Sequence, residues 1–420
     1  MIQNSFRNFP FGFRLESDAI RLLIRLLICL FPATVPAQNR KALAELEGRI
    51  RHGIRNREFP GAVMLVVHKG KVILKKGWGE TARNSGIRPN PNSSVYDLAS
   101  VTKGISTAGS LMKLYDEGKF RLDDSLGKFL PSSRQFPLGK LKIADLLAHR
   151  TGLPPYYISN YWLISKNRWD ESSFSPFPTE KFPDPYRGLY LPKGYREQML
   201  RDLSQLPFRP KPRTVYSDLN YILLGALVES LSGMRQDQFL ENWLIKPMNL
   251  QATCYNPLVH GIPADRIIPS MANPAAHGWV HDTEAGKLAG VCGAAGLFST
   301  AAELAEIGEM LRCGGRYKGK IMLKEKNIRH FAWKIHSGYA RGFGWQKPAG
   351  GMAKKSIAPA ASSSSAFGHT GHTGSLLWVD PQKQLTVVFL ANLTYPDDEP
   401  SVFTRKAGYR QILRLAYRLI

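Results

Sequence analysis

The sequence predicts an α/β (α+β) fold: an antiparallel β-sheet built from N- and C-terminal strands and flanked by helices, with an inserted, mainly helical lobe. Two observations indicate this arrangement. Short apolar segments of the kind that form β-hairpins lie near residues 62–78 and 375–390, whereas helical spacing of apolar residues dominates the region between them. A chain of 420 residues, of which 43% are hydrophobic, is long enough for one large two-lobed domain.

The first 37 residues are interpreted as a bacterial secretory signal peptide. Four arginines precede the apolar run 26–31, and Val35, Pro36 and Ala37 offer small residues for cleavage before Gln38. The run ends at Pro32 and is too short to span a bilayer. We therefore expect an exported protein, periplasmic or associated with the cell envelope. Its net charge of +24 and pI near 9.9 then favour weak contact with an anionic envelope surface rather than nucleic acid.

Residues 38–420 are predicted to form a single domain with a sheet lobe at about 38–99 and 290–420 and a helical lobe at about 100–289. The sheet lobe begins with a helix over 39–57 and a hairpin around Lys69-Gly70, and a second hairpin turns at 380–383. Further helical segments are expected at 141–147, 221–231, 237–245 and 301–311. This order places the start of the helical lobe at the seam with the sheet.

A Ser-x-x-Lys tetrad, Ser100 to Lys103, lies at that seam, where a helix is expected to run to about Gly118. Residues three apart on a helix project from one face, so the lysine amine can reach the serine hydroxyl and help to activate it. Backbone N–H groups at the helix start can stabilise an oxyanion. The tetrad alone is weak, because serine is a common N-cap and a second copy occurs at 125–128, in a turn-like stretch.

Two further motifs follow in the chain. Tyr216-Ser217-Asp218 precedes a helical segment, and His369-Thr370-Gly371-His372 precedes a strand. With these three motifs in order, the chain resembles the serine β-lactamase and penicillin-binding-protein superfamily, in its class C-like branch of β-lactamase-related serine hydrolases. The family pattern is Ser-x-x-Lys, Tyr-x-Asn and Lys-Thr-Gly, with His-Thr-Gly in many members of this branch. Stretches at 146–154, 293–300 and 341–345 also resemble it, so the similarity extends from about Leu46 to the C-terminus.

The resemblance implies a set of roles. Ser100 would be the nucleophile that forms an acyl-enzyme, with Lys103 and Tyr216 sharing the proton of its hydroxyl. A tyrosine hydroxyl ordinarily has a pKa of about 10, and a neighbouring ammonium favours the phenolate or a relay through both groups. The backbone N–H groups of Ser100 and His372 would form the oxyanion hole. Gly371 suits a close approach of backbone to substrate.

Two positions depart from the family pattern. Asp218 replaces an asparagine, so that a carboxylate able only to accept hydrogen bonds, and able to pair with Lys103, stands in place of an amide. His369, before Thr370, replaces a lysine that helps to bind a substrate carboxylate, and histidine supplies much less positive charge at neutral pH. Both changes count against an efficient β-lactamase. His369 and His372 also form an H-x-x-H pair, but this spacing in a glycine-rich loop does not indicate a metal site.

The sequence thus predicts an exported serine hydrolase that acts through an acyl-enzyme on an ester or amide, without metal or organic cofactor. Its substrate would be a small molecule or a peptide, and peptidoglycan-derived peptides fit the compartment. One alternative is a β-lactamase or D-alanyl-D-alanine carboxypeptidase, and another is a catalytically inactive module that binds cell-wall fragments. The aromatic segment 155–212 would either roof the site or pack on the helical lobe. The cysteines that follow the signal peptide are expected in the core, namely Cys254, Cys292 and Cys313.

Overall fold

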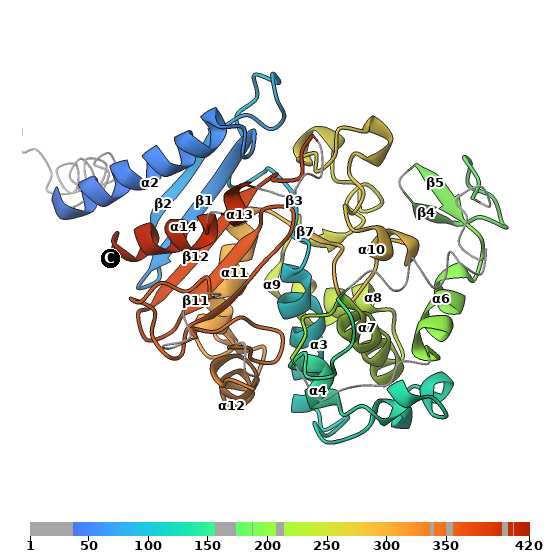
Figure 1. Ribbon diagram of the computed structural model, residues 1–420. Coiled ribbons are helices and arrows are strands. Elements are labelled where there is room, and N and C mark those ends of the chain that lie inside the picture. The colour runs from blue at the N-terminus through green and yellow to red at the C-terminus, as the bar shows by residue number, and fades with distance from the viewer. Residues whose placement is uncertain are drawn as a thin grey trace, which may run out of the picture.

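The computed structural model describes residues 37–155, 174–186, 188–206, 214–336, 340–349, 356–396, 402–405 and 407–420. Its main sheet has five strands in the order β10-β11-β12-β1-β2, and all neighbouring strands are antiparallel (Figure 1). The strands are β1 (Gly61–His68), β2 (Lys71–Gly79), β10 (Phe367–Thr370), β11 (Leu376–Asp380) and β12 (Leu385–Ala391). Strands from both ends of the chain therefore share one sheet, which confirms the predicted fold class.

The central strands β1 and β12 are buried along nearly their whole length, because both faces of the sheet are covered. Ala62 of β1 lies opposite Ala391 of β12, and the pairing continues to His68 opposite Leu385. The β1–β2 hairpin turns at Lys69 and Gly70, whose φ angles are 51° and 73°. Positive φ at both turn residues is typical of the type I′ turn, whose twist matches that of the flanking strands.

Helices cover both faces of the sheet (Figure 1). Helix α11 (Ala301–Arg312) packs on one face, where the core includes Val63 and Leu65 of β1. Helices α2 (Ala37–Arg55) and α14 (Gly408–Tyr417) cover the other face, where the core includes Met64 and Val66. Successive side chains of β1 therefore point into opposite layers of the core, as the pleat of a β-strand requires.

The region between the two sets of strands is mostly helical, as predicted. Its helices, with those that follow it, are α3 (Gly109–Asp116), α4 (Ile143–Leu147), α6 (Tyr195–Ser204), α7 (Asp218–Ser232), α8 (Gln236–Leu240), α9 (Lys246–Met248), α10 (Thr283–Lys287), α12 (Glu325–Ile328) and α13 (Val402–Arg405). Short 3₁₀ turns occur at Leu126–Lys128, Pro131–Ser133, Pro137–Lys140, Ala264–Arg266 and Pro274–Ala276. The small sheets comprise β3 (Tyr96–Asp97), β4 (Asp184–Tyr186), β5 (Leu189–Leu191), β6 (Cys254–Tyr255), β7 (Leu297–Ser299), β8 (Arg316–Tyr317) and β9 (Lys320–Ile321).

The helix after Ser100 is less regular than the spacing predicted. A π-helix, η1 (Lys103–Ala108), precedes α3, and two others are η6 (Glu241–Ile245) and η9 (Arg329–Trp333). Within η1, a methyl group on Gly104 would lie 2.7 Å from the ring of Trp345, so the glycine allows this large side chain to pack directly on the helix backbone. The widened turn lies next to the serine, where π-segments are often functional.

The predicted core cysteines differ in their burial. Cys254 and Cys292 are buried as expected, and burial raises the pKa of each thiol to about 12. Cys313 is exposed, so its assignment to the core was wrong: it follows α11 at the surface, where its sulfur contacts Arg312. Residues 1–36 of the predicted signal peptide and much of the aromatic segment 155–212 lie outside the described residues. In the parts of the chain that are described, no helix combines the length and apolar character needed to cross a membrane.

Candidate active site

Ser100 stands at a sharp turn between β3 and the helix. The preceding residue, Ala99, has a φ of 44°, an unusual conformation for a residue with a side chain. The Ala99 N–H donates to Asp97 Oδ1 at 2.8 Å and the Leu98 N–H to the Leu297 carbonyl at 2.9 Å, and these bonds hold the turn in place. Strain that is fixed by surrounding hydrogen bonds is typical of functional sites. Ser100 itself is partly exposed and so open to a substrate.

Lys103 is fully buried and its ammonium is surrounded by oxygen atoms. Nζ donates to Ser100 Oγ at 2.8 Å and to the Ala294 carbonyl at 2.7 Å, and Asp218 Oδ1 lies 2.7 Å away. Burial by itself lowers the pKa of Lys103, but the charges of Asp218 and Tyr216 outweigh burial and raise the pKa above its ordinary value. Lys103 therefore stays protonated at neutral pH and acts as a hydrogen-bond donor to Ser100.

Tyr216 is the second partner of the serine. Its Oη lies 2.9 Å from Ser100 Oγ, within hydrogen-bond distance. The ring is enclosed by cations and imidazoles: Lys103 Nζ lies 5.2 Å from the ring centroid, Arg341 Cζ lies 4.8 Å from it, and the His149 ring lies at 4.6 Å. The first two sequence motifs thus meet at one oxygen atom, Ser100 Oγ.

Asp218 occupies the first residue of α7 and its side chain is 17% exposed. A carboxylate at this end of a helix is stabilised by the helix dipole. Because its Oδ1 pairs with Lys103, the carboxylate serves to neutralise the buried ammonium. The pairing that the sequence suggested is therefore present.

The third motif lies on β10, an edge strand of the main sheet. His369 is only 2% exposed, its Nδ1 lies 2.7 Å from the Thr370 carbonyl, and its Nε2 accepts a hydrogen bond from Arg341 Nη1 at 3.3 Å. Burial, together with the charges of Arg341 and Lys103, holds the pKa of His369 well below its ordinary value. His369 is neutral at physiological pH and does not replace the charge of the family lysine. Thr370 Oγ1 accepts from Gln346 at 3.3 Å.

Gly371 packs directly against the turn that carries Ser100. A methyl group at this position would lie 2.1 Å from Ser375 Oγ and 2.4 Å from the Leu98 carbonyl, so no larger residue fits. Ser375 Oγ donates to that carbonyl at 2.6 Å. The Gly371 carbonyl in turn accepts from the buried Tyr409 hydroxyl of α14 at 2.8 Å. These contacts connect the third motif to both the turn at Ser100 and the last helix.

His372, the residue after the glycine, is exposed, and its ring lies 5.6 Å from that of His281. The His281 N–H donates to Asp97 Oδ2, and Asp282 caps helix α10 through the Ala285 N–H, so both residues have structural hydrogen bonds beside the site. Within the described residues, no group of three or more histidine, cysteine, aspartate or glutamate side chains is arranged to hold a metal ion. The structure thus brings all eight predicted site residues to the junction of the η1 helix, α7 and β10.

Residues 46–410 match the family model described as Beta-lactamase. The chain belongs to the Beta-lactamase family. A Salmonella gallinarum relative, provisionally named D-alanyl-D-alanine carboxypeptidase, is 28% identical over 397 residues, which cover 86% of each chain. The solved structure of EstCE1, a hydrolase with promiscuous acyltransferase activity, superposes with a TM-score of 0.66 at 20% identity and covers 89% of this chain and 99% of its own. A penicillin-binding-protein homologue from Caulobacter crescentus gives 0.64 at 17% identity, covering 93% and 99%.

Sequence reasoning about this Beta-lactamase family member missed the buried group behind Tyr216. His149 lies between the rings of Tyr216 and Tyr221, at 4.6 and 4.9 Å, and its Nδ1 accepts from the Ser217 N–H at 3.1 Å. Asn220 Oδ1 accepts from the Thr151 hydroxyl at 2.8 Å, which fixes the same group from the other side. The stretch 146–154 was noted only for its resemblance to the family, because nothing local in it shows which tyrosine the histidine contacts.

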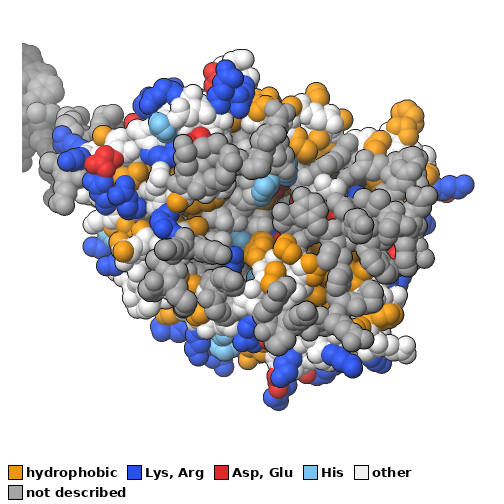
Figure 2. Space-filling model, viewed as in Figure 1, with side chains coloured by type: hydrophobic (Ala, Val, Ile, Leu, Met, Phe, Trp, Pro, Cys, Tyr) orange, Lys and Arg blue, Asp and Glu red, His pale blue; other side chains and the backbone are white. Residues whose placement is uncertain are grey.

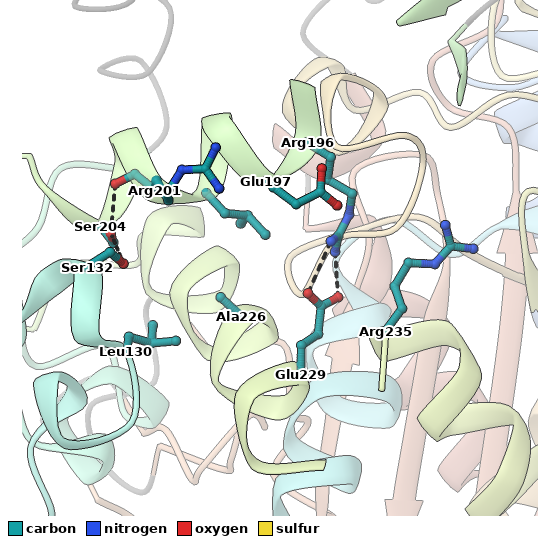
Figure 3. A pocket seen from close by; sticks show the side chains of 10 residues that line it. Leu130, Ser132, Arg196, Glu197, Arg201, Ser204, Ala226, Glu229 and Arg235 are labelled. Atoms are coloured by element: carbon teal, nitrogen blue, oxygen red, sulfur yellow. Dashed lines mark hydrogen bonds and ion pairs between the residues drawn. The ribbon is translucent and has the colours of Figure 1, made fainter. Parts of the chain in front are cut away.

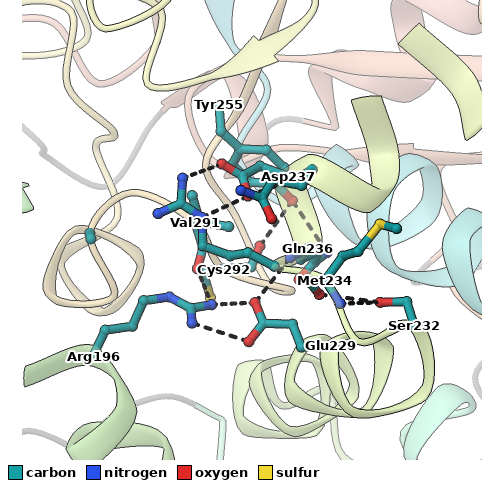
Figure 4. A network of polar contacts seen from close by, with 12 residues as sticks. Arg196, Glu229, Ser232, Met234, Gln236, Asp237, Tyr255, Val291 and Cys292 are labelled. Carbon is teal, nitrogen blue, oxygen red and sulfur yellow. Dashed lines mark hydrogen bonds and ion pairs between the residues drawn. The ribbon is translucent and has the colours of Figure 1, made fainter. Parts of the chain in front are cut away.

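A second buried network supports the helix that carries Lys103 (Figure 4). Arg196 of α6 forms a bidentate ion pair with Glu229 of α7, and Glu229 accepts from the Gln236 N–H at 3.0 Å. The Gln236 side chain then donates to Ser106 and Thr107 of η1 at 2.9 and 2.8 Å. This chain of contacts holds the η1 helix in register with α7.

A surface pocket of about 380 Å³ opens at the outer end of that network, between α6 and α7 (Figure 3). Its charged groups are largely neutralised within the protein, since Arg196 pairs with Glu229, and Arg235 with Asp237. None of Ser100, Lys103 or Tyr216 lines it. The second Ser-x-x-Lys copy has no such surroundings: exposed Lys128 pairs with the partly buried carboxylate of Asp124, as expected for a coincidence.

Proposed function

We propose that the protein is an exported serine hydrolase that acts through an acyl-enzyme on an ester or amide, with a cell-wall-derived peptide as the favoured substrate class. The observation that carries the proposal is the position of Ser100 Oγ, 2.8 Å from Lys103 Nζ and 2.9 Å from Tyr216 Oη. A serine that contacts both a charged lysine and a tyrosine is arranged for proton removal and nucleophilic attack.

Tyr216 is assigned as the general base. Because Asp218 keeps Lys103 protonated, the lysine donates to Ser100 Oγ and has no lone pair to accept a proton. In this assignment Tyr216 reacts as the phenolate, and the serine proton passes to its Oη as the Oγ–carbonyl carbon bond forms. When the tetrahedral intermediate collapses, the bond to the leaving oxygen or nitrogen breaks and Tyr216 returns the proton to that atom. In deacylation the Tyr216 phenolate takes a proton from water as the water oxygen attacks the acyl carbonyl, and the bond to Ser100 Oγ then breaks as Oγ takes that proton back.

The oxyanion is assigned to the backbone N–H groups of Ser100 and His372. Support comes from the packing of Gly371 on the Leu98 carbonyl, which draws the residue after it toward the nucleophile turn. The substrate would lie along the edge strand β10, near Thr370. No metal or organic cofactor takes part in these steps.

The substrate class is inferred from the positions that depart from the family pattern and from the relatives of this chain. His369 is neutral, so this position offers a substrate carboxylate no charge, which favours esters and simple amides over β-lactams. The Salmonella relative nonetheless supports D-alanyl-D-alanine carboxypeptidase action as a second candidate. The assembled serine, lysine and tyrosine count against an inactive binding module.

The proposal that the protein is exported rests on its N-terminal segment and on its net positive charge, which suits an anionic cell envelope. Lysine and arginine side chains are spread over the left side and the lower edge of the face in Figure 2. The N-terminus of protein recovered from the periplasm should begin at Gln38. Full-length protein confined to the cytoplasm would contradict export.

The test of the catalytic assignment is intact-mass analysis after exposure to a fluorophosphonate probe. We expect one adduct on the wild type, no adduct on Ser100→Ala, and labelling slowed at least about 100-fold in Lys103→Ala. Ser125→Ala, in the second tetrad, is the matched control and should label like the wild type. A folded wild-type protein that takes no adduct would sink the proposal and favour the binding module.

A further inference from the structure

Arg341 is a cation at the candidate site that no carboxylate of the described residues neutralises. Its guanidinium carbon lies 4.8 Å from the centroid of the Tyr216 ring, and Nη1 donates to His369 Nε2 at 3.3 Å. Within the described parts of the chain, Arg341 makes no ion pair with an aspartate or glutamate. A partly buried guanidinium without a counter-ion is costly, and such groups cluster at functional sites.

The turn that carries Arg341 is fixed on both sides. Arg341 pairs with Gln346 in an antiparallel bridge, and the Gln346 N–H donates to the Gly368 carbonyl of β10 at 2.7 Å. On the other side, Gly344 has a φ of 84°, and a methyl group there would lie 2.4 Å from the Cβ of Ala108 in η1. The turn is thus clamped between the helix of Lys103 and the strand of His369, so the guanidinium is held against Tyr216.

The other charged and titratable groups around Tyr216 do not supply net positive charge. Lys103 faces the ring from η1, but Asp218 of α7 neutralises it at 2.7 Å. His149 faces the ring from the loop after α4, and His369 from β10, at 4.6 and 6.2 Å. Both imidazoles are neutral, because burial and then the charge of Arg341 hold their pKa values well below the ordinary range.

Tyr221, one turn along α7, completes the surroundings, and burial raises the pKa of its hydroxyl, which stays neutral. The uncompensated positive charge next to Tyr216 therefore comes from Arg341. We propose that Arg341 is an electrostatic positioning residue that stabilises negative charge on Tyr216, in the place of the lysine that the family carries at position 369. The inference rests on the proposed function, since it concerns the same base, and it assigns the charge to an arginine from a different segment of the chain.

The experiment measures the second-order rate of fluorophosphonate labelling, and kcat/KM for the uncharged ester p-nitrophenyl acetate, from pH 5 to pH 10. Without the guanidinium, Tyr216 becomes a competent base only at higher pH. Arg341→Met should therefore move the acidic limb of both profiles upward by at least about one pH unit, which is about tenfold in rate at pH 7. Arg341→Lys keeps the charge and should retain most of the rate. Arg341→Met combined with His369→Lys should move the limb back.

Arg150→Met is the matched control, because Arg150 also contacts this region, donating to the His336 carbonyl at 3.0 Å, but pairs with Asp145. Its limb should not move. If the limb of Arg341→Met stays in place with the uncharged ester while KM rises only for substrates that carry a carboxylate, the guanidinium binds substrate and the inference is wrong. Equal loss in Arg341→Lys and Arg341→Met, with a lower Tm and an unmoved limb, would show a merely structural role. A wild type without Ser100-dependent labelling would instead refute the proposed function.

Discussion

Replacing Asp218 by asparagine keeps the shape of the side chain but removes the charge that faces the buried ammonium of Lys103. At 2.7 Å the attraction between the two charges is about 6 kcal/mol at an effective dielectric constant of about 20. Most of this attraction offsets the free-energy cost of burying the ammonium group of Lys103. Loss of one partner from a buried pair costs about 3–5 kcal/mol, and the amide oxygen of asparagine keeps an acceptor in place. We expect Asp218→Asn to lower the free energy of unfolding by about 3 kcal/mol.

The assay is a double-mutant cycle in urea with Lys103→Met, whose side chain has a similar length and no charge. Because Asp218 is partly exposed, an unpaired carboxylate there costs less, and the double variant should recover about 2 kcal/mol relative to the sum of the single variants.

The same variants have a characteristic pH dependence. In the wild type the raised pKa of Lys103 contributes stability that is fully present below about pH 10.4 and is lost only as pH rises through the folded-state value. In Asp218→Asn, burial lowers the pKa of Lys103, so the lysine can discharge and the difference from the wild type narrows between pH 7 and pH 10. Additive energies in the cycle, or a difference that does not change with pH, would refute this account of the ion pair.

Two further predictions concern the third motif. Gly371→Ala should abolish probe labelling, because its methyl group would lie 2.1 Å from Ser375 Oγ and 2.4 Å from the Leu98 carbonyl; labelling at the wild-type rate would show that the loop yields without affecting Ser100. Tyr409→Phe leaves the buried Gly371 carbonyl without its 2.8 Å hydrogen bond and should cost about 1–3 kcal/mol in urea denaturation, with slower labelling. An unchanged unfolding midpoint would mean that the contact is dispensable.

The sequence predicted the fold because its strongest patterns are local. The hairpin around Lys69 and Gly70, the second hairpin and the long helices all carry their own spacing and turn residues, and each forms where expected. The three motifs of the candidate site were also identifiable, since each is a short contiguous pattern whose order matches the family.

Contacts between distant segments could not be predicted in the same way. Arg341 was visible only as part of a stretch that resembles the family, and nothing near it in the chain reveals that it faces Tyr216. The contact of Gln236 with Ser106 and Thr107 joins residues about 130 positions apart, and has no local signature. The packing of Trp345 on Gly104, within the π-helix after Ser100, likewise joins segments that are far apart in the chain.

The pairing of β1 with β12 also determines when the molecule can become active. A ribosome adds about 5–20 residues per second, so Ala62 waits roughly 15–65 s for its partner Ala391 to be synthesised. Until then the central sheet cannot close, and neither Gly371 nor Tyr409 is available to fix the turn at Ser100. The growing chain therefore carries Ser100 without the contacts that hold its turn in place. The candidate site is therefore complete only after β12 and the last helix have been synthesised and have docked.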